Sequence, residues 1–324
     1  MEKLGVVLFF GLIVLSGFVS AQDIFDSNSE MNITSPGLVF YNYSKIQLKI
    51  EINEKCDLGY TDYVLGIQDF YYNFYNESEN FILLDGKKYK LLCRDCDNYD
   101  KIKRFKEGIH ILNFKCLDKP EINTSSLFFV DTKIPRISEA FPEQDSFMNG
   151  LFVVGYTEEN PIVIGVNLSS YYLTKTGFPI PDIPLDEVCP FGRNKMCFFE
   201  TDLSEYDGEE IEYSFFIWDF GLNQVETKKI KVKVDTTLPV INFINYSINK
   251  NAVNFNISVD EKNFDFGGYF DYKYKNLKFK KICSELDNGS CNSKKAFSKG
   301  NHTLGFFVFD KAGNYANQNV SFVI

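Results

Sequence analysis

The chain has 324 residues, of which 44% are hydrophobic and 24% charged, and its formal net charge is −10. A chain this acidic repels phosphate, which excludes nucleic acid as an expected partner. Its 33 phenylalanines and 19 tyrosines supply enough apolar surface for several hydrophobic cores of ordinary domain size.

The first 21 residues have the features of a secretory signal peptide. A short charged start is followed by an uncharged apolar stretch from Leu4 to Val19, and small residues precede Gln22. We therefore predict residues 1–21 to be a signal peptide cleaved after Ala21, and the protein to be secreted or extracellular, or attached to the cell surface. The alternative is an uncleaved anchor, although 16 apolar residues fall short of the roughly 20 that cross a bilayer. No later segment is long and apolar enough to span a membrane, so none is expected after cleavage.

Two phrases that contain aspartate recur along the rest of the chain. One is centred on Asp118, Asp219 and Asp310; in its last two copies an aromatic run ends at the aspartate and an asparagine follows four residues later. The other, Asp-Thr-x-x-Pro, begins at Asp131 and at Asp235, with a period of 104 residues. A repeat of this length with a strand-turn-strand pattern predicts three tandem β-domains, at residues 22–131, 132–235 and 236–324, and not one large enzyme fold.

Alternation of apolar and polar residues predicts the strands. The predicted runs are Ile46–Ile52, Leu151–Tyr156, Ile162–Val166, Glu212–Trp218, Ala252–Val259 and Gln318–Ile324. A further strand is expected where Phe270, Tyr272 and Tyr274 alternate with polar residues after a Gly267-Gly268 break. No pattern of period 3.6 extends beyond a turn or two outside the signal peptide. The expected fold class is therefore all-β, with antiparallel β-sandwiches.

The repeated phrases are interpreted as turns and joints. Aspartate accepts hydrogen bonds from local amides, and glycine and asparagine tolerate positive φ, so each Asp-to-Asn segment should be the hairpin between the last two strands of a module. The residues assigned to these structural turns are Asp118, Asp219, Asp310, Asn223 and Asn314. An acidic residue with Asn or Lys also follows the second strand of each module, at Glu54-Lys55, Glu158 to Asn160 and Glu261 to Asn263, and indicates another repeated turn. The Asp-Thr-x-x-Pro joints are short, which predicts a semi-rigid rod.

Eight cysteines in a secreted chain indicate disulfides. The second and third modules hold two each, which predicts Cys189–Cys197 and Cys283–Cys291. In the first module we expect Cys56–Cys116 and Cys93–Cys96, although four cysteines allow three pairings. A zinc site formed by the same four residues is the alternative, but only Cys93-x-x-Cys96 has the tight spacing of zinc ligands.

Together these motifs resemble a known family. A cysteine pair, a Gly-x-His-x-Leu-like strand entry, an aromatic strand into Asp-x-x-Gly-Asn and a closing strand into Asp-Thr-x-x-Pro are similar to the tandem immunoglobulin-like repeats of bacterial and archaeal surface and S-layer-type proteins. The resemblance covers most of residues 22–324; the first module departs from it at Pro120, within Asp118 to Asn123. It implies three tandem immunoglobulin-like antiparallel β-sandwiches and a role in cell-surface architecture, adhesion or display.

Asn-x-Ser/Thr sequons are more frequent than chance, which gives about three. The ten candidate glycosylation sites are Asn32, Asn42, Asn76, Asn123, Asn167, Asn245, Asn256, Asn288, Asn301 and Asn319. Their excess favours a glycosylated surface protein. An asparagine-rich composition that places polar residues on exposed strand faces is the alternative explanation.

No catalytic residue, cofactor or metal ligand is assigned from the sequence. The two histidines, His110 and His302, each lie eight residues before their module's aspartate, so a structural role at the strand entry explains both. Calcium at the joints would use Asp131 or Asp235 with carboxylates of a neighbouring loop, but no loop is densely acidic.

The sequence as a whole predicts a non-enzymatic secreted or cell-surface protein with a structural or adhesive role, whose partners are other surface proteins or glycans. The alternative is a secreted carbohydrate-binding module protein. It would stack sugars on the aromatic stretches Asp69 to Tyr75 or Phe270 to Tyr274, although alternating aromatics also suit a sandwich core.

Overall fold

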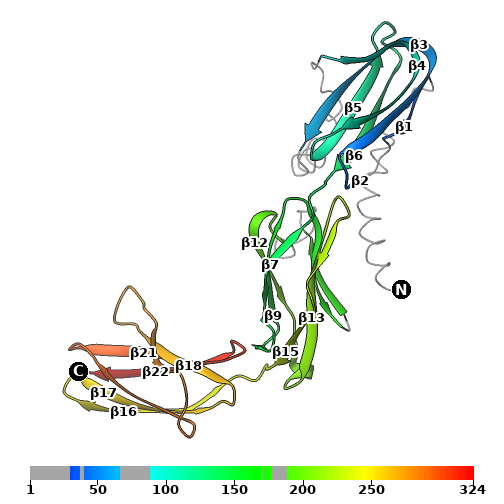
Figure 1. Ribbon diagram of the computed structural model, residues 1–324. Coiled ribbons are helices and arrows are strands. Elements are labelled where there is room, and N and C mark those ends of the chain that lie inside the picture. Colours follow the sequence, from blue (N-terminus) through cyan, green and yellow to red (C-terminus); the bar gives the residue numbers. More distant parts are fainter. Residues whose placement is uncertain (1–29, 37–39, 66–87, 170, 177–187) are drawn as a thin grey trace.

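The computed structural model describes residues 30–36, 40–65, 88–169, 171–176 and 188–324. The predicted signal peptide, the sequon at Asn76 and the aromatic stretch from Asp69 to Tyr75 lie outside the described residues. Within them the chain is almost entirely β-structure, arranged as three modules that follow one another end to end (Figure 1). No helix in this part of the chain is long and apolar enough to cross a membrane.

Module 1 is one bent six-stranded sheet. Its strands are β1 (Met31–Ser35), β2 (Phe40–Tyr41), β3 (Lys45–Leu65), β4 (Lys90–Arg104), β5 (Gly108–Cys116) and β6 (Asn123–Val130). The first half of β3 pairs with β1 and the second half with β5, and β4 pairs with both halves. The turn expected at Glu54-Lys55 is instead an irregularity inside β3, because the chain shifts register between Glu51 and Cys56 without leaving the sheet.

Module 2 is a sandwich of two sheets. Its elements are β7 (Arg136–Phe141), β8 (Phe147–Met148), β9 (Leu151–Glu158), β10 (Pro161–Leu168), β11 (Tyr171–Thr176), β12 (Gly192–Glu200), the 3-10 helix η2 (Ser204–Tyr206), β13 (Glu210–Asp219), β14 (Gln224–Glu226) and β15 (Ile230–Val234). One sheet has the order β12-β9-β7 and the other β11-β10-β13-β15-β8, with β14 also paired to β13.

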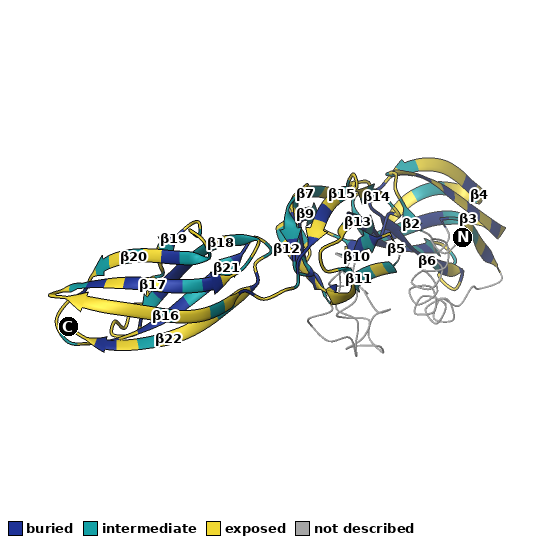
Figure 2. Cartoon of the chain, turned by 90° about the horizontal axis from the view of Figure 1, so that it is seen from below, coloured by how far each residue is buried: buried dark blue, intermediate teal, exposed yellow. Residues whose placement is uncertain are grey.

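Module 3 repeats this arrangement. Its strands are β16 (Val240–Asn249), β17 (Ala252–Asp260), β18 (Phe264–Asp271), β19 (Lys280–Cys283), β20 (Ser290–Ala296), β21 (Asn301–Asp310) and β22 (Tyr315–Val323). Sheet β16-β17-β20 packs on sheet β19-β18-β21-β22. The core lies between the sheets, where the alternating apolar residues predicted in β17 (Val253, Phe255, Ile257 and Val259) are buried (Figure 2).

The predicted fold class is confirmed: the chain is all-β, with immunoglobulin-like antiparallel sandwiches in tandem. Each module has its own hydrophobic core. The short strands β2 and β8 pair in parallel with the last strand of their modules, and every other pair of named strands is antiparallel.

One predicted strand is wrong. The strand expected over Phe270, Tyr272 and Tyr274 ends at Asp271, and β18 instead runs through Gly267 and Gly268. The glycines do not break the strand because aromatic side chains cover them; a Cβ atom on Gly268 would meet the ring of Phe279. The chain turns after Asp271 because its carboxylate accepts a hydrogen bond from the Lys273 amide at 3.1 Å.

The structure brings together the four cysteine pairs that the sequence analysis named. The Cα–Cα distances are 5.5 Å for Cys56–Cys116, 6.1 Å for Cys93–Cys96, 5.3 Å for Cys189–Cys197 and 6.0 Å for Cys283–Cys291. Cys56–Cys116 joins the bend of β3 to the end of β5, and the pairs of modules 2 and 3 both enclose short segments that end in β12 and β20.

Candidate cation sites at the module joints

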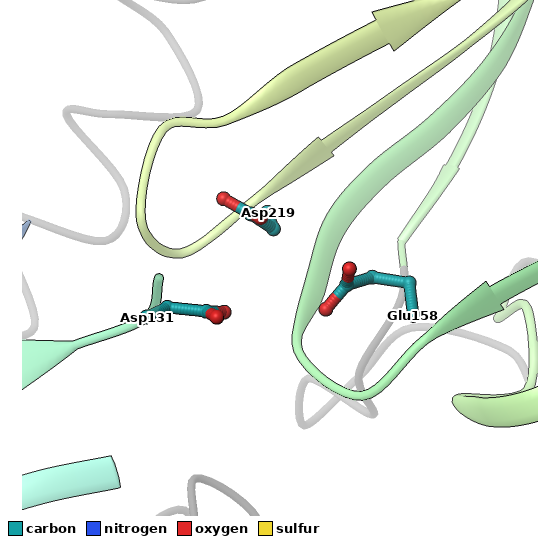
Figure 3. Close-up of side chains that lie close together, drawn as sticks. All are labelled: Asp131, Glu158 and Asp219. Atoms are coloured by element: carbon teal, nitrogen blue, oxygen red, sulfur yellow. The ribbon is translucent and has the colours of Figure 1, made fainter. Parts of the chain in front are cut away.

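Three carboxylates meet at the joint between modules 1 and 2, which we call joint 1. Asp131 follows β6 of module 1, Glu158 ends β9 and Asp219 ends β13, so strand geometry fixes the position of each (Figure 3). One carboxylate oxygen from each residue lies within 4.8 Å of the others. The residues are 0%, 3% and 0% exposed, so three acidic groups are withdrawn from water together.

Two asparagines of module 2 hold the Asp131 segment in place. The Asn160 side chain donates a hydrogen bond to Asp131 Oδ2 at 3.0 Å, and its backbone amide donates to Glu158 at 2.7 Å. The Asn223 side-chain amide donates to Asp219 Oδ2 at 2.9 Å and to the carbonyls of Asp131 and Lys133 at 3.2 Å. The hairpin and the second-strand turn of module 2 therefore both bind the joint that precedes them.

Joint 2, between modules 2 and 3, has the same construction. Asp235, Glu261 and Asp310 form a second group of carboxylates whose oxygens lie within 4.8 Å of one another. Asn263 donates to Asp235 Oδ2 at 2.6 Å, and Asn314 donates to the Asp235 carbonyl at 2.8 Å. The arrangement is therefore a repeated feature of the chain.

The threonine of each joint is held from the other side, by the preceding module. At joint 1 the Thr132 amide donates to Glu107 at 2.9 Å, and the Thr132 hydroxyl bonds the same carboxylate. At joint 2 the Thr236 amide and hydroxyl donate to Asp207 at 2.6 and 3.0 Å. Each Asp-Thr pair is thus bound by side chains of both modules that it connects.

Burial perturbs the acids of joint 1. It raises the pKa of Asp131 to about 6 and the pKa values of Glu158 and Asp219 to about 7, against the partly opposing effect of hydrogen bonds from Asn160 and Asn223. Charge repulsion from Asp131 also raises the pKa of Glu158, and repulsion from Asp131 and Glu158 raises the pKa of Asp219. At joint 2, burial raises the pKa of Asp310 and of Glu261.

Such a group needs compensating positive charge. Lys133 contributes little, since its ammonium pairs with Glu159 at 2.7 Å outside the cluster. Compensation must come from protons or from a cation. Three carboxylates without His or Cys match the all-oxygen ligand preference of hard cations such as Ca²⁺. Because the acids are buried within the joint, the arrangement suits binding a small ion, not acid–base chemistry on a substrate.

The sequence identified part of this site. Asp310 and Asn314 lie in the predicted hairpin between the last two strands of module 3, and Asp219 and Asn223 lie in a hairpin between β13 and β14 that the further strand β15 follows. All four residues also contact the joints. Asp118 lies at the other end of its module; it accepts a hydrogen bond from the Asp57 amide at 2.8 Å and belongs to neither cluster.

The sequence suggests Asp131 or Asp235 as possible calcium ligands at the joints, but it does not reveal their carboxylate partners, because these come from separate segments and no loop is densely acidic. A signal existed in the repeat: Glu158 follows Asp131 by 27 residues, and Glu261 follows Asp235 by 26. Both glutamates were interpreted only as turn residues.

The two histidines have structural environments. His110 Nδ1 lies 2.9 Å from Asp62 and its Nε2 lies 2.8 Å from the Lys106 carbonyl. His302 is held in the same way, at 2.7 Å from Asp271 and 2.8 Å from the Ser298 carbonyl. Both rings are about 1% exposed, so no substrate reaches them.

The sequon asparagines are accessible. Of the nine in the described residues, Asn167 is half-buried and the other eight are exposed: Asn32, Asn42, Asn123, Asn245, Asn256, Asn288, Asn301 and Asn319.

The aromatic residues that the sequence placed in cores are accessible in part, since Tyr272 and Tyr274 are each 46% exposed.

Comparison with known proteins adds little beyond the fold. No protein-family model matches the chain, and no curated protein matches it. Solved structures with a similar arrangement include the FN1–FN3 domains of chicken CNTN1, which are 7% identical, with a TM-score of 0.41 over 90% of this chain and 97% of that one. A tetra-tandem repeat from the extending region of a large adhesion protein is 10% identical, with a TM-score of 0.31 over 91% of this chain and 73% of that one. At these values the likeness carries no argument about function.

Proposed function

We propose that the protein is a non-enzymatic secreted or cell-surface protein of prokaryotic surface-layer type, built as a semi-rigid rod that spaces or displays other surface components. The observation that supports the proposal is that each joint forms hydrogen bonds with both of the modules that it connects. Thr132 is bound by Glu107 of module 1, whereas Asp131 is bound by Asn160 of module 2, and joint 2 repeats both contacts. A linker with hydrogen bonds to both neighbours does not behave as a flexible chain.

A structural role is favoured over catalysis by where the reactive groups lie. The acids of joint 1 are at most 3% exposed, and both histidines are bonded through both ring nitrogens. The expected partners are other surface proteins or glycans. Nucleic acid is not expected, because the net charge is −10. Four disulfide pairs and accessible sequons support an extracellular glycoprotein.

Small-angle scattering of the mature chain tests the rod. We expect an elongated particle with one narrow distribution of dimensions. Replacing Asn223 and Asn314 by alanine should broaden that distribution while each module stays folded, because these side chains bind the joints. Asn242→Ala is a matched control, since this exposed residue makes only a 3.4 Å contact within module 3. A broad ensemble for the unaltered chain, or native protein in the cytosolic fraction, would contradict the proposal.

A second candidate function is cation-dependent stiffening, which the two carboxylate clusters favour. Ca²⁺ bound at each joint would replace protons and tie the Asp-Thr linker to the following module. A chelator should then lower the melting temperature and broaden the scattering dimensions. A melting temperature that is the same in calcium and in chelator would remove this candidate and leave the rod proposal intact.

Carbohydrate recognition remains the alternative to a purely structural role. It is favoured by the 46% exposure of Tyr272 and Tyr274, which lie beside the half-buried Phe270. A glycan array probed with the mature protein distinguishes the two: binding that is lost in Tyr274→Ala would favour recognition, and the absence of any binding would favour the structural role.

A further inference from the structure

The sequon at Asn319 lies on the outer face of a module 3 sheet. Asn319 in β22 pairs with Gly305 in β21, and paired residues of antiparallel strands point to the same face. The neighbours of Gly305 in β21, Leu304 and Phe306, are buried in the core at 0% and 1% exposure. Asn319 itself is exposed, so its side chain extends from the sheet into solvent beside a position that has no side chain.

An aromatic ring fills the space above that glycine. A Cβ atom added to Gly305 would lie 2.5 Å from Tyr272 Oη and 2.9 Å from Tyr272 Cζ, so the tyrosine ring lies directly on the glycine. Directly opposed side chains in a sheet have Cβ atoms about 4.5–5.5 Å apart. The hydroxyl end of the Tyr272 ring therefore lies beside the Asn319 side chain, and the residue Tyr272 stays 46% exposed.

An exposed ring next to a sequon is suited to a sugar. A pyranose has an apolar face of C–H groups and polar edges, and tyrosine likewise combines an apolar ring with a hydroxyl group that stays hydrated. A sugar linked to Asn319 Nδ2 begins within reach of the ring and loses little freedom on packing against it, because the covalent bond already holds it there.

Module 2 contains a related arrangement. Asn167 in β10, also a sequon asparagine, pairs with Tyr172 in β11, whose ring is 38% exposed. The next outer position of β10 is Gly165, and a Cβ there would meet the ring of Phe216. The Asn301 sequon differs: it lies at the start of β21 on the same face as Asn319, but its partner in β22 is Val323, which has no ring.

We propose that Asn319 carries an N-linked glycan whose first pyranose ring stacks on Tyr272 and covers the outer face of β21 and β22. The inference rests on the glycosylation proposed above and adds which sequon is coupled to the fold and through which residue. On this proposal the aromatic segment after Phe270 supports the protein's own glycan and is not a binding site for a free carbohydrate.

Site occupancy is the first measurement. The full-length chain is expressed in a host that attaches N-glycans to secreted proteins, and glycopeptide mass spectrometry determines which sequons are modified. We expect a hexose or N-acetylhexosamine chain at Asn319. If other sequons are modified and Asn319 is not, the inference is overturned and the glycoprotein proposal stands; if no sequon is modified, both are overturned.

Hydrogen exchange of the β21 and β22 amides tests the stacking. Enzymatic removal of the glycan should make exchange in these strands roughly 2- to 10-fold faster, the range for loss of one aromatic contact. In Tyr272→Ala the same treatment should change the exchange rate little. Tyr274→Ala, which removes an equally exposed ring bonded to Ser298 at 3.2 Å, should retain the full effect of deglycosylation.

Two further measurements separate stacking on Tyr272 from other effects of a glycan on this face. Asn301→Gln removes a glycan from the same face without the ring, and it should leave the exchange rates of β22 unchanged. If Tyr272→Ala does not fold, magnetisation transfer between sugar protons and the Tyr272 ring in the unaltered glycoprotein replaces it. If Asn319 is modified but deglycosylation changes the exchange rates equally in the unaltered chain and in Tyr272→Ala, the stacking is refuted. The absence of magnetisation transfer would refute it as well. In both cases the glycosylation of Asn319 stands.

Discussion

The buried acids of joint 1 should give the metal-free protein an unusual response to pH. Their folded-state pKa values of about 6 for Asp131 and about 7 for Glu158 and Asp219 lie above the ordinary carboxyl values, so folding favours their protonated forms. The folding free energy that these raised pKa values contribute is fully present below about pH 4 and is lost as the pH rises through 6 and 7. We predict that raising the pH from 5 to 8 in chelator lowers stability by about 1–3 kcal/mol for each such carboxyl.

Differential scanning calorimetry at several pH values measures this response. Asp219→Asn, which removes the charge, should flatten the pH dependence. Glu139→Gln, an exposed carboxyl on β7, should leave it unchanged. Stability that increases between pH 5 and 8 in the absence of metal would show that these acids are not buried together.

Calcium should oppose the same effect. Because a cation replaces the protons, adding Ca²⁺ at pH 8 should raise the melting temperature, and a concentration 100-fold above its dissociation constant would contribute about 2.7 kcal/mol per site. Asp219→Asn and Asp310→Asn remove one ligand from each cluster, and the double variant should lose the response. An equal response to Mg²⁺ would indicate ionic screening and not a site, since Mg²⁺ requires a smaller octahedral cage.

The buried pair of His302 and Asp271 should stabilise module 3. His302 Nδ1 lies 2.7 Å from Asp271 Oδ2, and its Nε2 lies 2.8 Å from the Ser298 carbonyl and 3.5 Å from Lys273 Nζ. The side chains are 0% and 3% exposed. Asp271→Asn would weaken this buried hydrogen bond, and we predict a loss of about 1–3 kcal/mol in urea unfolding. Asp62→Asn in module 1 should cost less, since Asp62 is 26% exposed; equal losses would argue against desolvation as the cause.

At the scale of single elements, the disulfides should differ in what they contribute. In the chain-entropy model a bond stabilises by restricting the unfolded chain, so Cys56–Cys116, with a separation of 60 residues, should contribute about 4 kcal/mol. Cys189–Cys197, with a separation of 8, should contribute about 2.5 kcal/mol. We predict that replacing the first pair by alanines lowers the urea midpoint of its module more than replacing the second. The reverse order would mean that packing of the buried sulfurs outweighs chain entropy.

Local patterns in the sequence predict the elements whose two faces differ. Ala252–Val259 alternates strictly and lies within β17, because one of its faces is in the core and the other in solvent. The strand expected after Gly267-Gly268 differs for a physical reason: β19 pairs with both glycines, and the Phe279 ring, just before β19, covers Gly268, so the strand continues through them. The composition of the clusters at the joints is likewise set by tertiary contacts, since Asp131 reaches Glu158 and Asp219 of module 2 only when module 1 is joined to it.

At the scale of the whole molecule, the two joints have the same polar contacts and different apolar ones. At joint 1 the buried Phe220, 1% exposed, lies with its ring centroid 5.8 Å from that of Phe40 and 5.6 Å from that of Phe129 in module 1. At joint 2 the residue that follows the hairpin aspartate is Lys311, and its ammonium lies 6.0 Å from the Phe147 ring. The line of modules also bends between modules 2 and 3 (Figure 1).

This difference predicts that joint 2 is the more flexible. An ammonium at 6.0 Å from a ring, partly exposed, contributes about 0.5–1 kcal/mol, whereas a buried phenylalanine between two rings contributes several times more. Distance distributions between labels on neighbouring modules should therefore be somewhat wider across joint 2 than across joint 1, within the narrow range of a semi-rigid rod. Phe220→Lys should broaden the first, and Lys311→Phe should narrow the second, because each gives one joint the contact of the other. If both distributions are equally narrow and neither exchange alters them, the hydrogen bonds of the Asp-Thr linkers are sufficient to make the rod rigid, and the apolar contacts serve only the stability of joint 1.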